Sequence, residues 1–158
     1  MKIGIAGVHY GHIGGMFRSA INAPNGDVIG IYEPRDELYH KYADDHDLQR
    51  FDDLESLVIA SDMVAEGMRH EEKADLVKLC ARHGTYAYLD KPLCRNDDDY
   101  ERIASAVSES GIKLTMNFTS RRYPPFVALQ QAIHNDELGE IVSLITTHPH
   151  KLGSSAPD

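Results

Sequence analysis

A lysine at the end of a short apolar segment is the strongest candidate for chemistry in this sequence. Residues Tyr86–Leu89 read as a buried strand, and Asp90, Lys91 and Pro92 follow it directly. Burying an unpaired ammonium group is costly and proline removes a backbone donor, so the strand must end here. Because ligands bind at the carboxyl ends of strands in open α/β sheets, Lys91 is predicted to be a cation held at a ligand-binding edge. The alternative is a lysine that pairs with Asp90 at an ordinary strand end.

A glycine-rich turn between the first predicted strand and the first predicted helix is the second candidate. Small residues there let the backbone approach a pyrophosphate group, and the helix N-terminus supplies free N–H groups. Counted from Gly7, the second and third glycines of a G-x-G-x-x-G pattern are replaced by His9 and His12. The alternative is that the glycines only permit tight packing of the strand on the helix. The predicted cofactor contacts in this turn are Gly7, His9, Tyr10, Gly11, His12 and Ile13.

The second predicted strand ends on Glu33, Pro34 and Arg35, which bear on the choice of cofactor. Glu33 follows Gly7 at about the spacing at which an acid meets the ribose hydroxyls of adenosine, and such an acid favours NAD. Arg35 could instead pair with a 2′-phosphate and admit NADP. Both residues are predicted to contact the cofactor, with NAD slightly favoured. The alternative is an exposed acid beside an ordinary surface arginine.

Short apolar runs alternate with segments of helical periodicity, which predicts repeated β-α-β units. The predicted strands are 2–6, 28–32, 50–51, 63–65, 86–89, 112–118 and 141–146, so the strand before Lys91 is the fifth. The predicted helices lie at 13–21, 35–45, 54–57, 71–83, 97–110 and 124–138. The predicted fold class is α/β, a doubly wound parallel sheet with helices on both faces. Gly67, Met68 and His70 follow the fourth strand and are predicted to flank the same ligand, unless His70 only begins a helix.

Composition argues against several classes of partner. The chain has 158 residues, a formal net charge of −9 and no basic cluster longer than Arg121–Arg122, so nucleic acid is not an expected partner. No apolar run approaches the roughly 20 residues of a membrane span. Cys80 and Cys94 are typical of free thiols in a reducing compartment, and a cytoplasmic location is predicted. His9 and His12 lack a third ligand, so no metal site is predicted.

Several motifs occur in one order along the chain and carry a resemblance to a known family. They are the glycine turn, Glu33–Pro34, Phe51–Glu55, His70, Leu89–Leu93 and Arg122–Pro124. This order resembles the N-terminal half of the glucose–fructose oxidoreductase, inositol dehydrogenase and MocA family (Gfo/Idh/MocA), over nearly the whole chain. The family's most specific short motif is Glu-Lys-Pro, which here reads Asp90-Lys91-Pro92. Residues 136–141 are also similar to the family's entry into its second domain.

The resemblance implies an NAD(P)-binding Rossmann domain at residues 1–120, then a linker helix and the start of a truncated α+β substrate domain at 121–158. It implies an NAD(P)-dependent oxidoreductase that transfers hydride at a sugar or polyol-type hydroxyl carbon. Lys91 would contact the nicotinamide ribose and the substrate hydroxyl, where an ammonium group stabilises alkoxide charge and relays a proton. Asp90, Pro92 and Arg122 would also contact the cofactor. A small-molecule substrate and a homo-oligomeric full-length form complete the expectation.

Members of the family carry a later Asp…His pair whose histidine is the catalytic base, and the sequence stops at Asp158, before that region. We therefore expect the 158-residue chain to bind cofactor with little or no turnover. A dinucleotide-sensing or regulatory protein on the same fold is the main alternative. A methyltransferase-like α/β domain is a third, and Lys91–Pro92 counts against it. His148 and His150 are interpreted as loop residues rather than as a replacement base or metal ligands.

Overall fold

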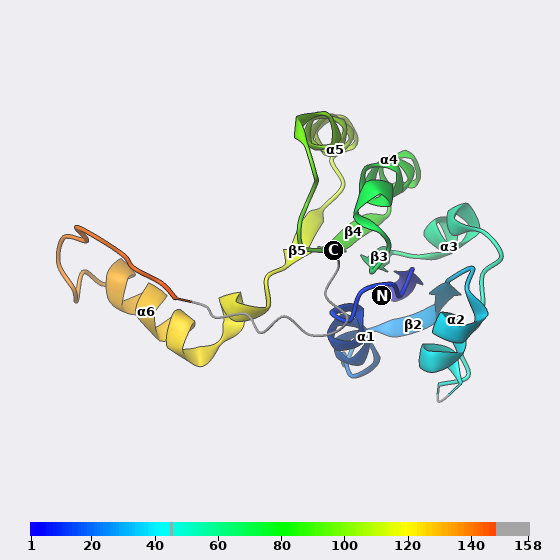
Figure 1. Cartoon of the computed structure of the whole chain (residues 1–158), viewed down its shortest axis with the longest axis horizontal. Helices are drawn as coiled ribbons and strands as arrows, with labels where there is room; N and C mark the ends of the chain where they lie inside the picture. The colour runs from blue at the N-terminus through cyan, green and yellow to red at the C-terminus, as the bar shows by residue number, and fades with distance from the viewer. Residues whose placement is uncertain (45, 148–158) are drawn as a thin grey trace. The chain divides into compact units, whose positions relative to one another are not determined.

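The structure of the chain, a computed structural model, describes residues 1–44 and 46–147. It divides into a first unit, Met1–Phe118, and a second unit that begins at Thr119. The first unit is built on a five-stranded parallel sheet with the strand order β2-β1-β3-β4-β5 (Figure 1). Its strands are β1 (Lys2–Ala6), β2 (Asp27–Tyr32), β3 (Met63–Glu66), β4 (Tyr86–Asp90) and β5 (Leu114–Asn117).

Helices cover both faces of this sheet. On one face lie α1 (Ile13–Ile21) and α2 (Asp36–Ala43), and on the other lie α3 (Leu54–Ala60), α4 (Lys73–His83) and α5 (Asp97–Ser110) (Figure 1). Successive side chains of a strand point to opposite faces, and the two cores follow this alternation. Ile3 and Ile5 pack in the core with α1, whereas Val64, Ala87 and Leu89 pack in the core with α4. The predicted doubly wound α/β sheet is therefore confirmed.

The helices that frame the end of β4 begin and end where the sequence signals them. The side chain of Asn96 caps α5 by accepting a hydrogen bond from the Asp99 N–H at 2.8 Å. Gly84 and Gly111 end α4 and α5 with φ of 71° and 70°, a left-handed conformation that favours glycine. These ends hold β4 and β5 in register, so that Asp90 lies opposite Asn117.

The strand order places a switch point between β1 and β3. β2 pairs with one side of β1 and β3 pairs with the other. In doubly wound sheets, ligands bind in the crevice at the carboxyl ends of the strands beside such a point. The turns that follow β1 and β3 meet there, because the His9 N–H donates to the Gly67 carbonyl at 2.7 Å and the Gly67 N–H donates to the Ala6 carbonyl at 2.9 Å.

The predicted short strand at 50–51 is wrong. Arg50 forms only an isolated bridge with Ile31 beside β2. The side chain of Asp53 already caps α3 by accepting from the Ser56 N–H at 2.7 Å, so the chain leaves the sheet edge within a few residues. The strand that ends directly before Lys91 is consequently β4, the fourth strand rather than the fifth. The strand that ends directly before Gly67 is β3, the third strand rather than the fourth.

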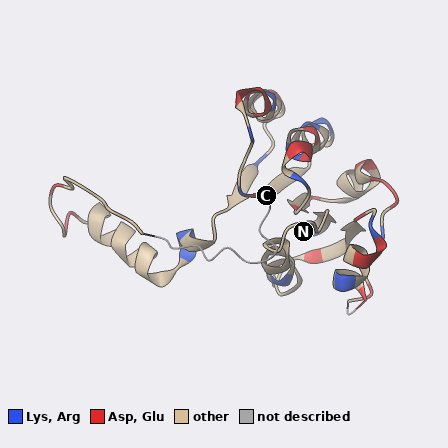
Figure 2. Cartoon of the chain, viewed as in Figure 1, with Lys and Arg blue, Asp and Glu red and all other residues tan. Residues whose placement is uncertain are grey.

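The second unit contains a 3₁₀ turn, Thr119–Arg122, and α6 (Pro124–His134). α6 carries no Lys, Arg, Asp or Glu and has no buried residue (Figure 2). The predicted strand at 141–146 is wrong, because residues 141–147 have no regular structure and no neighbouring strand pairs with them within the described chain. Val142 and Ile145 are 90% and 87% exposed. His148 and His150 lie outside the described residues.

Candidate functional site

The conformation of the turn after β1 depends on glycine and on a backbone hydrogen bond. Gly7 has φ 68°, and its N–H donates to the Tyr32 carbonyl at 2.8 Å. A Cβ atom at Gly7 would lie 2.6 Å from the Met68 Cγ atom, and one at Gly67 would lie 2.7 Å from the Ile13 Cβ atom. The two glycines therefore let the turns after β1 and β3 approach each other closely.

Three successive backbone N–H groups in the glycine turn indicate an anion-binding site. Within residues 1–44 and 46–147, the N–H groups of Tyr10, Gly11 and His12 donate to no hydrogen-bond acceptor. They lie directly before α1, whose N-terminus carries partial positive charge. A Cβ atom at Gly11 would meet nothing within 4 Å, so the backbone is open here. Free amides at a helix N-terminus beside an open backbone bind phosphate groups.

Glu33, at the end of β2, is buried and fully hydrogen-bonded. One oxygen accepts from the Arg35 backbone N–H at 3.1 Å and from its Nε at 2.7 Å. The other accepts from the Val8 N–H at 3.0 Å and from Arg35 Nη2 at 2.9 Å. Burial alone raises the pKa of Glu33, but these hydrogen bonds outweigh it and the pKa is lowered. Glu33 is therefore a carboxylate whose four acceptor positions are occupied by the protein itself.

Arg35 continues this network towards the glycine turn. Its side chain is 40% exposed, and Nη1 donates to His9 Nδ1 at 2.6 Å. His9 packs edge-on against the ring of Tyr10, and Tyr10 stacks on His70 with ring centroids 4.4 Å apart. These side chains form a row along the carboxyl edge of the sheet, from the end of β2 to the turn after β3. The row brings together His9, Tyr10, Arg35 and His70, four of the residues predicted to contact the cofactor.

His70 is partly buried and lies near charges of both signs. Burial lowers its pKa and the charges of Lys73 and Lys91 lower it further, although the charges of Asp90 and Glu71 act in the opposite direction. Its Nδ1 atom is buried and has no hydrogen-bond partner in the described part of the chain. His70 begins a 3₁₀ turn, His70–Glu72, so it is both a helix-start residue and a member of the site.

Asp90, at the end of β4, pairs with a histidine rather than with the neighbouring lysine. Its Oδ2 atom lies 3.0 Å from His12 Nδ1, and the carboxyl group is 2% exposed. Its Oδ1 atom is buried without a partner in the described residues. Lys91 is exposed, and its side chain makes no hydrogen bond or ion pair with any described residue. The alternative in which Lys91 is neutralised by Asp90 is therefore not what the chain adopts.

Two charged residues of the site, Glu66 and Lys73, were not predicted from the sequence. Lys73 is 1% exposed, and Glu66, the last residue of β3, is 0% exposed. Lys73 Nζ lies 3.4 Å from Glu66 Oε2. A signal was present, because Lys73 precedes Leu76, Val77 and Cys80 at the i, i+3, i+4 and i+7 positions that form the buried stripe of a helix. A lysine on that stripe predicts a buried charge.

Burial raises the pKa of Glu66 to about 7, although the nearby Lys73 charge acts in the opposite direction. A carboxyl group whose pKa is higher in the folded state stabilises the fold most when it is protonated. That contribution is complete below pH 4.5 and is lost as the pH rises through about 7. The shift corresponds to about 3 kcal/mol of unfolding free energy.

We expect the variant Glu66→Gln to remove this pH dependence. Urea unfolding at pH 5 and at pH 8 measures the fall in unfolding free energy over that interval. The fall should be smaller by about 2–3 kcal/mol in the variant, because glutamine does not titrate and part of the contribution is already lost at pH 5. Glu37→Gln, at an exposed position on α2 whose side chain makes no ion pair with any described residue, serves as the control and should leave the pH dependence unchanged. Equal pH dependence of Glu66→Gln and the parent would contradict the assignment.

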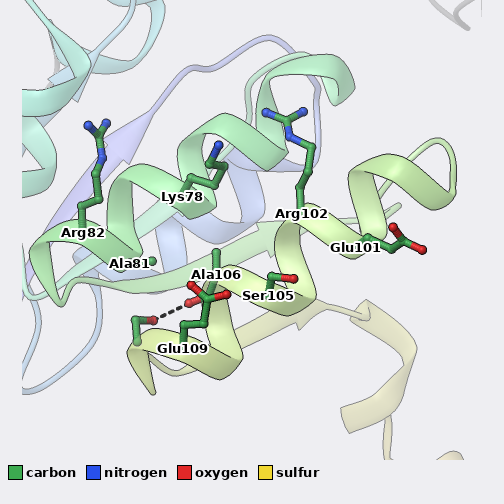
Figure 3. Close-up of a pocket in the computed structure, with 9 residues that line it drawn as sticks. Lys78, Ala81, Arg82, Glu101, Arg102, Ser105, Ala106 and Glu109 are labelled. Atoms are coloured by element: carbon green, nitrogen blue, oxygen red, sulfur yellow. Dashed lines mark hydrogen bonds between the residues drawn. The ribbon is translucent and has the colours of Figure 1, made fainter.

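Arg122, which was predicted to contact the cofactor, lies in the 3₁₀ turn of the second unit and is exposed. An open groove of about 700 Å³ between α4 and α5 contains none of the predicted site residues (Figure 3). It is lined by the C-terminal part of α4 and by α5, with Lys78, Arg82 and Arg102 among its residues. Among described residues, no group of three or more His, Cys, Asp or Glu is arranged to hold a metal ion.

Comparison with known proteins identifies the family. A model of the Gfo/Idh/MocA group, described as an oxidoreductase family with an NAD-binding Rossmann fold, matches residues 1–118. The chain belongs to the Gfo/Idh/MocA family. The resemblance inferred from Asp90-Lys91-Pro92 and the glycine turn is thus confirmed.

Individual members of the Gfo/Idh/MocA family are distant in sequence. Inositol 2-dehydrogenase of Rhizobium meliloti is 34% identical over 77 residues, which is 47% of this chain and 22% of that protein. A protein of Desulfitobacterium hafniense assigned as an NADPH-dependent oxidoreductase has a TM-score of 0.81 at 20% identity, over 89% of this chain and 41% of that one. Scyllo-inositol dehydrogenase of Lactobacillus casei has a TM-score of 0.78 at 15% identity, over 89% and 43%. The chain thus spans about two-fifths of these solved structures, which agree with it in fold.

Proposed function

We propose that the first unit binds a nicotinamide dinucleotide along the carboxyl edge of β2, β1, β3 and β4, as part of an NAD(P)-dependent oxidoreductase. The observation that carries the proposal is the group of free amides of Tyr10, Gly11 and His12 at the start of α1. It is the phosphate-binding feature that a dinucleotide requires, and it lies at the switch point of the sheet. The family description supports the same reading.

The residues of the site fit such a cofactor from end to end. Arg35 and His9 lie at the β2 end of the row, where the adenosine ribose is bound in this fold. At the other end, the buried Asp90 Oδ1 and His70 Nδ1 atoms have no partner in the described chain and are available to polar groups of a ligand. Met68 packs against Gly7 of the glycine turn, Gly67 packs against Ile13 at the start of α1, and Pro92 directly follows Lys91.

Lys91 is the proposed catalytic residue. A bound nicotinamide supplies or accepts the hydride. Lys91 extends from the end of β4 without a protein partner among the described residues, so its ammonium group is free to bind the substrate hydroxyl. An ammonium group held there stabilises negative charge on that oxygen and moves its proton. The substrate class that we propose, by resemblance to the family, is a sugar or polyol-type alcohol.

We also propose that residues 119–147 belong to a substrate domain. The apolar side chains of α6 are exposed, with Phe126 at 49% and Ile133 at 43%, and the helix has no charged residue. Uncharged helices with exposed apolar side chains are normally covered by another surface. A larger substrate domain or a second copy of the protein would cover them.

Free Cys80 and Cys94 support the cytoplasmic location that we propose. None of the helices in the described residues is long and apolar enough to cross a membrane.

For the cofactor, the geometry supports NADP over NAD. Glu33 was the reason to favour NAD, but its oxygens are buried and occupied by Arg35 and Val8. Arg35, in contrast, is partly exposed and presents Nη1 next to His9. A 2′-phosphate binds to an arginine with charge-assisted hydrogen bonds, and His9 can supply a second donor. We therefore propose that Arg35 and His9 recognise the 2′-phosphate of NADPH.

We expect Arg35→Ala to weaken NADPH binding about 30-fold and NADH binding less than about threefold. The estimate corresponds to ~2 kcal/mol for a lost hydrogen bond to a charged group. Fluorescence titration of both reduced cofactors measures the two dissociation constants. Arg18→Ala, an exposed arginine on α1, is the matched control and should change neither. Equal losses for the two cofactors would exclude a 2′-phosphate role for Arg35.

Thermal melting in the presence of NADH, NADPH or S-adenosylmethionine tests the proposed function itself. A ligand that binds only the folded chain raises its Tm in proportion to the logarithm of its concentration. We expect both nicotinamide cofactors to raise the Tm, NADPH more strongly. A shift with S-adenosylmethionine alone would favour a methyltransferase-like domain and contradict the proposal. No shift with either nicotinamide cofactor would also contradict it.

A further inference from the structure

Lys73 occupies a position that its own element does not favour. It is the first residue of α4, where a positive charge opposes the helix dipole. It is also 1% exposed, although lysine is almost never fully buried unless its ammonium group is paired. The side chain must therefore be held there by contacts outside the helix.

The hydrogen bonds that hold the Lys73 side chain are made to the turn that contains Lys91. Lys73 Nζ donates to the Asp90 carbonyl at 2.5 Å and to the Pro92 carbonyl at 2.8 Å. An ammonium group has three donors, and Glu66 Oε2, 3.4 Å away, lies nearest to the third. The two carbonyl groups flank Lys91 on either side. Lys73 thus binds the turn from the protein interior and leaves the Lys91 side chain exposed.

Glu66, the last residue of β3, is hydrogen-bonded to the same turn. Its Oε2 atom accepts a hydrogen bond from the Asp90 N–H at 3.2 Å. The pair of Glu66 and Lys73 therefore joins the end of β3, the start of α4 and the end of β4. A buried ion pair contributes little net stability compared with apolar residues of the same size, and its best-supported role is to select one conformation.

We propose that Lys73, supported by Glu66, is a positioning residue that fixes the Asp90–Pro92 turn and so directs Lys91 towards a bound nicotinamide cofactor. The proposal rests on the proposed function for its consequence, but the contacts that carry it do not involve a cofactor. A merely structural role would make stability the only property that depends on Lys73. A positioning role makes the mobility of the turn and the cofactor affinity depend on it separately.

The two cysteines of the chain provide a probe for the turn. Cys94 is half-buried and lies two residues after Pro92, so its reaction rate with a thiol reagent follows the opening of the turn. Cys80 is fully buried on α4, and burial raises its pKa to about 12, so it reacts only when the whole unit unfolds. The ratio of the Cys94 rate to the Cys80 rate separates local opening from global unfolding.

The experiment compares the full chain with Lys73→Met, the double variant Glu66→Gln/Lys73→Met, and the control Lys78→Met, an exposed lysine of α4. Lys73→Met should lower the Tm by about 10 °C because Glu66 is left unpaired. Its Cys80 rate should rise with this loss of global stability, and its dissociation constant for NADPH should rise about tenfold. The double variant should recover most of the Tm and with it the Cys80 rate of the parent. Its ratio of the Cys94 to the Cys80 rate and its dissociation constant for NADPH should both stay about tenfold above those of the parent. Lys78→Met should resemble the parent.

Recovery of all three properties in the double variant would overturn the proposal, because Lys73 would then only neutralise a buried carboxylate. A ratio of thiol rates in the double variant equal to that of the parent would overturn it as well. If the parent chain binds no nicotinamide cofactor, the proposed function fails, and the ratio of thiol rates alone still decides whether Lys73 holds the turn. If Lys73→Met does not fold, the double variant decides in its place.

Discussion

Lys91→Ala is expected to lower turnover by about 10²–10⁴-fold in a form that includes the proposed substrate domain, while NADPH affinity stays within about threefold of the parent. The reason is that the Lys91 side chain has no protein partner among the described residues, so its loss disturbs neither the fold nor the glycine turn. In its proposed role, the residue acts only when a substrate oxygen develops charge. Steady-state kinetics on that form and fluorescence titration of NADPH measure the two effects.

The comparison needs a lysine that is exposed but distant from the site. Lys78→Ala on α4 meets that requirement and should leave both turnover and NADPH affinity unchanged. Turnover in Lys91→Ala equal to that of the parent would show that Lys91 has no catalytic role. A large loss of NADPH affinity with unchanged turnover at saturating cofactor would make it a binding residue only.

Gly7→Ala is expected to abolish detectable NADPH binding and to destabilise the first unit by about 2–4 kcal/mol. The residue has φ 68°, a conformation that costs roughly 1–2 kcal/mol for an alanine. In addition, the new Cβ atom would lie 2.6 Å from Met68 Cγ and 3.0 Å from Met68 Cα. The turns after β1 and β3 must then move apart, which displaces the free amides before α1. Urea unfolding and NADPH titration measure both effects.

Gly84→Ala isolates the part of this cost that comes from the backbone alone. Gly84 has φ 71°, nearly the same as Gly7, but a Cβ atom there would meet nothing within 4 Å. It ends α4 away from the site, so Gly84→Ala should lose only about 1–2 kcal/mol and no NADPH affinity. If Gly7→Ala behaved like Gly84→Ala in both measurements, the close approach of the two turns would not be needed for binding.

The strands and the sheet edge could be predicted because local signals agree with the fold. Apolar runs end at Gly7, Glu33, Gly67 and Asp90, and parallel pairing brings all of these ends to one edge. The strand before Lys91 was placed correctly along the chain but counted as the fifth. The error arose at Arg50, whose neighbours resemble a strand although only one bridge to Ile31 forms.

The partners of charged residues could not be predicted, because they come from separate segments. The pairing of His12 with Asp90 joins the glycine turn to the end of β4. The burial of Lys73 depends on two carbonyl groups that only the turn after β4 presents. Glu33 and Arg35 are close in sequence, yet spacing alone does not say whether the acid faces the ligand or its own arginine. The strand expected at 141–146 failed because apolar residues without a pairing strand do not form one.

The proposed nicotinamide dinucleotide site lies at the carboxyl edge of the sheet. Mapping of amide NMR shifts on titration with NADPH tests this site most directly, because it reports each backbone position separately. We expect the largest shifts at residues 7–13, 33–35, 67–70 and 90–93, with little change in the groove between α4 and α5. Shifts centred on Lys78, Arg82 and Arg102 of that groove, or no shifts at millimolar NADPH, would contradict it.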